Sequence, residues 1–253
     1  MPGKHSYRKH WLALSRTRLV SFGNLMDNLA VINDFLSKPY STIIVGFCLL
    51  LSGCNKGFTL KIQDQDIFAF GSQDSCNFMT TTVLANSLRV SWKTSTPVNL
   101  IITESVPAEF DSEIIAAAAK WNTTLGKNLL TVTRDNGFKN TPGTDRVNAI
   151  YWSTEWDIEQ LAQQARTAVR WDISRLIDTD IRINAKYFLF SKTADANAQG
   201  KVNLESLIVH ELGHVLGLTH IPESASVMQT HLASGIIRNQ PGAVDVRSMN
   251  CEY

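Results

Sequence analysis

The distribution of apolar and polar positions along the chain predicts a mixed sheet with helices packed against it. Alternating apolar residues, typical of strands, occupy 90–94 and 98–102, and further strand candidates are 129–133, 149–152, 167–171 and 179–184. A helix is predicted over 107–125, with Pro107 in its first turn and Gly126 directly after its end. Helical spacing predicts that this helix buries Ile114, Ile115, Ala118 and Trp121. The order of helix, strands and a later helix favours an α+β fold.

The later helix is predicted from Asn203 to about Leu216. The side chain of Asn203 is suited to capping the free N–H groups of a first turn. Gly217 follows where the helix should stop, because glycine adopts the left-handed conformation at little cost.

The N-terminal part of the chain has a different character. Residues 42–52 form an eleven-residue run without a charge, shorter than the roughly 20 residues that a membrane-spanning helix needs. The run follows Lys38 and favours the apolar region of an export signal, the alternative being a buried strand or helix. Leu51-Ser52-Gly53-Cys54 resembles a bacterial lipobox, which implies cleavage before Cys54 and a lipid on its thiol.

We therefore expect three parts in the chain. Residues 1–53 are a leader and lipoprotein signal peptide, 54–88 a tether and N-terminal extension, and 89–253 a single folded domain. A start at Met26 would give a signal of more usual size.

Composition and charge narrow the class of protein. The 253 residues are 44% hydrophobic and 19% charged, which is ordinary for a globular protein. The net charge of +1 argues against a dedicated nucleic-acid binder. Because the leader holds six basic and two acidic residues, its removal leaves a net charge of −3.

Candidate chemistry is concentrated in and directly after the second predicted helix. His210 and His214 are four residues apart, so both side chains lie on one helix face and can bind one zinc ion. After Gly217 the chain can reverse and bring His220 to the same ion as a third ligand. Three protein ligands leave one position for water and substrate, which is typical of a catalytic zinc. Glu211 lies beside the metal and can accept a proton from zinc-bound water.

This motif resembles that of the metzincin zinc endopeptidases, and specifically the matrixins. Met228, in Ser226-Val227-Met228-Gln229, resembles their methionine turn, and Asp245 resembles the opening of their C-terminal helix. Together with the lipobox, the chain resembles bacterial matrixin lipoproteins. The resemblance implies that 89–253 is a metzincin-like domain with a mixed twisted sheet, an N-terminal domain helix, an active-site helix and a short C-terminal helix. It also implies an endopeptidase with one catalytic zinc on His210, His214 and His220, and Glu211 as the catalytic residue.

The sequence departs from the matrixin pattern at several positions. Gln229 and Thr230 follow Met228 where Tyr-Pro is usual, so substrate specificity cannot be carried over. Only His231 remains for the structural zinc of vertebrate-type matrixins. Calcium sites are possible at four acidic residues, although solvated loop acids are the simpler interpretation of each: Asp172, Asp178, Asp180 and Asp195.

Two cysteines remain once Cys48 has left with the signal and Cys54 has been lipidated. In an exported protein Cys76 and Cys251 most simply form a disulfide. The alternative is that Cys76 binds the metal as an inhibitory thiolate, but the Pro-Arg-Cys-Gly motif of a cysteine-switch propeptide is not found.

The expected partners are a protein or peptide substrate and, through the N-terminal lipid, a membrane of the bacterial cell envelope on its periplasmic or cell-surface side. An extended substrate would pair with an exposed sheet edge, for which 167–171 is the candidate strand.

We expect the protein to be a monomer. The alternatives are a non-catalytic zinc-holding binding lipoprotein of the envelope and a zinc hydrolase that acts on cell-wall peptides. Glu211 and Gly217 favour an enzyme over a binding protein.

Overall fold

A computed structural model describes residues 76–195 and 198–253 of the chain. The predicted signal peptide, Cys54 and most of the predicted tether lie outside the described residues. Within the described part, no helix combines the length and apolar character needed to cross a membrane.

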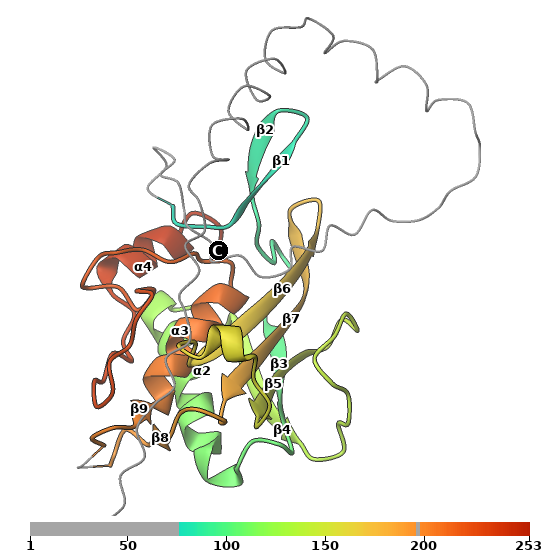
Figure 1. Cartoon of the computed structure of the whole chain (residues 1–253). Coiled ribbons are helices and arrows are strands. Elements are labelled where there is room, and N and C mark those ends of the chain that lie inside the picture. The colour runs from blue at the N-terminus through green and yellow to red at the C-terminus, as the bar shows by residue number, and fades with distance from the viewer. Residues whose placement is uncertain (1–75, 196–197) are drawn as a thin grey trace, which may run out of the picture. The chain divides into compact units, whose positions relative to one another are not determined.

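A five-stranded sheet forms the centre of the domain, with strand order β4-β3-β5-β7-β6 (Figure 1). Neighbouring strands are parallel except β6, which runs antiparallel to β7 at the end of the sheet. The prediction that 167–171 lies in an edge strand is therefore confirmed. The strands are β3 (Val98–Thr103), β4 (Leu130–Asp135), β5 (Asn148–Ser153), β6 (Ala165–Asp172) and β7 (Arg175–Asn184).

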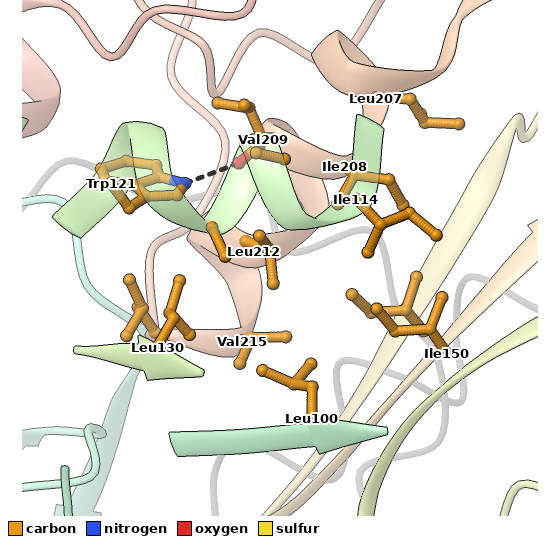
Figure 2. Packing of buried hydrophobic residues seen from close by; sticks show 14 of the residues in the cluster. Leu100, Ile114, Trp121, Leu130, Ile150, Leu207, Ile208, Val209, Leu212 and Val215 are labelled. Carbon is orange, nitrogen blue, oxygen red and sulfur yellow. Dashed lines mark hydrogen bonds between the residues drawn. The ribbon is translucent and has the colours of Figure 1, made fainter. Parts of the chain in front are cut away.

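Two helices pack on each other and on the sheet. They are α2 (Asp111–Leu125), which follows the 3-10 turn η1 (Ala108–Phe110), and α3 (Leu204–Val215). Figure 2 shows Leu100, Leu130 and Ile150 of the sheet facing side chains of both helices. Trp121 of α2 is fully buried, and its indole Nε1 donates to the Val209 carbonyl of α3 at 2.9 Å. Ile115, expected to be buried, is 49% exposed.

The segment 90–94, predicted to be a strand, is not one. A hairpin of β1 (Thr80–Val83) and β2 (Asn86–Arg89) precedes it, and Ser91 makes only an isolated bridge to Arg175. Val90 and Trp92 are buried, and the Trp92 indole donates to the Val215 carbonyl at 2.8 Å, so the segment crosses the core beside the end of α3.

The packed domain includes residues upstream of the expected boundary at residue 89. Phe78 and Met79 are buried, and Phe78 forms a bridge with Leu218 beyond α3. A disulfide joins Cys76 to Cys251, with their Cα atoms 6.1 Å apart. The N-terminal extension therefore packs directly against the turn that follows α3.

The remaining elements are short. A 3-10 turn η2 (Ile158–Gln160) precedes β6, and β8 (Phe190–Ser191) pairs in parallel with β9 (Val202–Asn203) just before α3. Helix α4 (Ala243–Met249) is the short C-terminal helix that the resemblance implied.

Candidate metal centre

Local sequence fixes both ends of α3. Asn203 Oδ1 accepts hydrogen bonds from the Ser206 N–H at 2.9 Å and the Ser206 hydroxyl at 2.6 Å, which caps the helix. Gly217, with a φ of 105°, lets the chain reverse directly after the helix. A Cβ there would lie 2.5 Å from the Val90 carbonyl oxygen, so the backbone conformation and the lack of space both require glycine.

The reversal brings the three histidines together. The Nε2 atoms of His210, His214 and His220 lie 3.1–3.2 Å from one another. Ligands about 2.0–2.1 Å from a tetrahedral zinc are about 3.3 Å apart, so the observed triangle has a fitting size. Within the described residues this is the one group of three or more potential ligands that could hold a metal ion.

Backbone carbonyls set the protonation of two of these rings. His210 Nδ1 lies 2.7 Å from the Val227 carbonyl oxygen, and His214 Nδ1 lies 2.8 Å from that of Leu218. Because a carbonyl only accepts, each Nδ1 carries the proton and each Nε2 keeps a lone pair for a metal. Burial, reinforced by the neighbouring imidazoles, lowers the pKa of His210 well below its ordinary value and that of His214 to about 3. Both rings are therefore neutral, the form that binds metal.

Glu211 lies next to His210 and is 5% exposed. Its Oε2 accepts a hydrogen bond of 2.5 Å from the hydroxyl of Thr167 on β6. Burial raises the pKa of Glu211 to about 7, and the Thr167 hydrogen bond lowers it in part. A carboxylate that titrates near neutrality is suited to accept and return a proton.

Met228 packs against the helix that carries the histidines. Its side chain is fully buried, and a Cβ at Gly213 would lie 2.3 Å from the Met228 sulfur. The turn that holds Met228 is anchored by Asp245 of α4, whose carboxylate accepts from the Ser226 hydroxyl at 2.5 Å and the Val227 N–H at 3.0 Å. Since the Val227 carbonyl contacts His210, this turn supports a candidate ligand directly.

A cleft of about 640 Å³ contains the histidines and Glu211. Thr167 and Val169 of β6 line one part of it, and residues 229–232 and Arg238 line another.

Residues 107–250 match the family model of the matrixins. The chain belongs to the matrixin family. The comparison with curated protein sequences returns no match. Matrixins are zinc metallopeptidases, and the three histidines of this matrixin domain form a group that could bind the ion.

Three contacts of the matrixin site could not be identified from local sequence. The Thr167 hydroxyl reaches Glu211 from β6, 44 residues upstream. Asn77 accepts from the Thr219 N–H and hydroxyl and donates to the Thr219 carbonyl, so it holds the residue next to His220. Arg238 approaches from the segment after Met228. None of these residues is part of a motif, and only the assembled fold shows their role.

The four acidic residues considered for calcium have different environments. Asp172 and Asp195 are exposed. The interpretation as solvated loop acids is wrong for Asp178 and Asp180, which are buried in β7 and form ion pairs with Arg170. Backbone N–H groups donate to both carboxylates: Gly143 to Asp180, and Asp145 and Arg146 to Asp178. These donors are contacts of a loop anchor rather than of a cation site.

Proposed function

We propose that this matrixin is a zinc-dependent endopeptidase that hydrolyses peptide bonds in a protein or peptide substrate. The supporting observation is the triangle of three histidine Nε2 atoms, 3.1–3.2 Å apart, beside a buried Glu211 in a cleft bordered by a sheet edge. We assign His210, His214 and His220 as the zinc ligands and Glu211 as the general base. Met228 supports the ligands from below the helix.

Residues of the chain itself account for substrate binding along β6 and for proton transfer through Glu211. His210, His214 and His220 would hold a zinc ion, which would supply a Lewis acid to polarise the scissile carbonyl and to acidify water. Glu211 takes a proton from the attacking water and later delivers it to the leaving amine. Thr167 orients the Glu211 carboxylate through the 2.5 Å hydrogen bond. The substrate backbone lies extended along β6, where main-chain hydrogen bonds fix its register.

The mechanism is tested by Glu211→Ala. We expect this variant to keep one zinc per chain, measured by elemental analysis, and to lose cleavage of casein by roughly a thousandfold or more. Glu223→Ala is the matched control, because Glu223 is exposed and its side chain lies outside the cleft. Retained cleavage in the Glu211 variant would contradict the mechanism.

Cleavage assays on further substrates separate the endopeptidase from the two alternatives, a zinc-holding binding lipoprotein and a hydrolase of cell-wall peptides. Stoichiometric zinc with no cleavage of casein, of a peptide library or of purified cell wall would favour the zinc-holding binding lipoprotein. Release of stem peptides from cell wall, with casein intact, would favour a hydrolase of cell-wall peptides. A chelator control shows whether any cleavage depends on the metal.

We further propose that residues 1–53 export the chain and that a lipid on Cys54 anchors the domain in the bacterial cell envelope through residues 54–75, which precede the packed segment that begins at Cys76. Support comes from the uncharged run 42–52 and the lipobox-like Leu51-Ser52-Gly53-Cys54. The Cys76–Cys251 disulfide suits an oxidising compartment. Cys54→Ser should move the protein from the membrane fraction to the soluble fraction and abolish labelling by a fatty acid. An unchanged distribution would contradict the anchor.

A further inference from the structure

Arg238 occupies the end of the cleft beside the first turns of α3, and three contacts fix its position. Its backbone N–H donates to the Ser206 hydroxyl at 2.8 Å. Its guanidinium donates from Nη1 to Gln229 Oε1 and from Nη2 to the His231 carbonyl at 2.8 Å. The side chain lines the same cleft as Ser206, His210 and Glu211.

The charge of Arg238 is not neutralised locally. Among the described residues no carboxylate forms an ion pair with it, and both acceptors that it contacts are neutral. Asp245 acts on it only at longer range, and this carboxylate already accepts from Ser226, Val227 and Gly242. The positive charge of Arg238 also contributes to the lowered pKa of His210, so its field reaches the candidate metal group. A half-buried cation without a counter-ion favours an incoming anion.

Gln229 holds the guanidinium in this orientation. The Gln229 Nε2 donates to the Glu223 carbonyl at 3.0 Å, which points its Oε1 toward Arg238. Gln229 is also the residue at which the chain departs from the Tyr-Pro that usually follows the methionine turn. The departure therefore places in this part of the cleft a polar amide that accepts a hydrogen bond from Arg238.

We propose that Arg238 forms a carboxylate subsite, so that the enzyme prefers substrates with a glutamate or aspartate at one position adjacent to the scissile bond. This inference rests on the proposed peptidase function. A guanidinium carries five N–H donors, of which two are used by Gln229 and His231. The remaining donors match a carboxylate, which accepts charge-assisted hydrogen bonds from a planar fork.

The first measurement is cleavage of a peptide library by the zinc-loaded full chain, which should show acidic residues enriched at one position next to the cleaved bond. Three peptides that carry Glu, Gln or Leu at that position then isolate the charge. We expect kcat/KM for the Glu peptide to exceed that for the Gln peptide on the order of tenfold to a hundredfold, and Arg238→Gln to bring this ratio close to one. Arg238→Lys should keep part of the preference, because the charge remains while the fork geometry is lost.

Arg166→Gln is the matched control. Arg166 lies on β6, lines the same cleft and donates to Gln160, so its loss removes one positive charge without touching the Arg238 contacts. We expect Arg166→Gln to keep the Glu-over-Gln ratio. An equal loss in both variants would overturn the subsite, because it would attribute the preference to the general field of the cleft. Wild-type cleavage without any acidic preference would also overturn it. Melting temperature and zinc content show whether the Arg238 variants are folded.

Binding separates failure of this inference from failure of the proposed function. Zinc-loaded Glu211→Ala should bind the Glu peptide more tightly than the Gln peptide in a calorimetric titration, and the additional Arg238→Gln substitution should abolish the difference. If wild type cleaves no peptide, unstructured peptides that carry Glu or Gln at a central position replace this pair, and a difference in binding that Arg238→Gln abolishes means that the peptidase function fails and the carboxylate subsite stands. If cleavage occurs and the difference is absent, the subsite alone fails.

Discussion

At the scale of single residues, the ionisation of Glu211 depends on its burial and on one hydrogen bond that opposes the effect of burial. Burial raises its pKa to about 7, and the Thr167 hydroxyl opposes that rise because it stabilises the carboxylate. Thr167→Val removes the donor, so the pKa of Glu211 should rise further. A general base works in its ionised form, so activity is lost as pH falls through this pKa. The acidic limb of kcat/KM against pH should therefore move to higher pH in Thr167→Val and stay in place in Thr167→Ser. An unshifted limb in the valine variant would show that Thr167 does not tune the base.

Gly213 is a second residue whose identity is set by one neighbour. A Cβ at this position would lie 2.3 Å from the Met228 sulfur and 3.3 Å from a ring carbon of Trp121. Gly213→Ala should therefore destabilise the domain by about 1–3 kcal/mol from overpacking, although alanine is the better helix former. Gly143→Ala is the control, because its nearest contact would be at 3.5 Å. Urea denaturation measures both, and equal midpoints for the two variants would contradict the close packing of Met228 on α3.

At the scale of elements, α4 supports the histidines from a distance through Asp245. This buried carboxylate joins Gly242, at the start of α4, to Ser226 and Val227 in the methionine turn. The Val227 carbonyl in turn holds the His210 ring. Helix α4 therefore helps to hold the His210 ring in place, although it carries none of the three histidines.

Asp245→Ala should weaken zinc binding by about 10–100-fold, the usual effect of losing an outer-shell support. It should also lower stability, since three donors lose a buried acceptor. Competition with a chromophoric chelator measures the zinc affinity, and Asp172→Ala, an exposed carboxylate at the end of β6, serves as the control. A less stable variant with unchanged zinc affinity would mean that Asp245 anchors α4 only.

Most elements could be predicted from sequence because their signals are local. These signals are the Asn203 cap, the Gly126 and Gly217 stops and the alternation in β3, and each depends on a few neighbouring residues. The exposure of Ile115 and the course of 90–94 could not be predicted from sequence, because tertiary packing decides which side of a segment is covered. The three histidines were predictable from their spacing on and after one helix. Sequence could not predict the contacts that support the site from Thr167, Asn77 and Arg238, because the partners of these residues lie on other segments of the fold.

At the scale of the whole domain, the two ends of the described chain are joined near the metal group. The Cys76–Cys251 disulfide ties the segment before β1 to the residues after α4. Next to it, Asn77 holds Thr219, the neighbour of His220, and the Met79 N–H donates to the Gly217 carbonyl at 2.8 Å. Glu252 adds ion pairs to Arg89 and Lys93. The position of the third histidine therefore depends on residues 76–79, far from it in sequence.

Opening the disulfide should consequently affect both stability and metal retention. The bond closes a sequence separation of 175 residues, and its loss in Cys76→Ser should lower the free energy of unfolding by roughly 2–5 kcal/mol. Zinc should also dissociate faster, because the segment that holds Thr219 and His220 loses a covalent attachment. Thermal unfolding and chelator-driven zinc release measure the two effects.

Cys251→Ser and the double variant complete the test. If the effect comes from the bond, both single variants and the double variant should lose the same stability, and a reductant should weaken wild type but none of the three. Additive losses would mean that the cysteines act as separate buried side chains. Faster zinc release in all three variants would identify residues 76–79 as part of the scaffold of the metal group, whereas unchanged release would confine the disulfide to global stability.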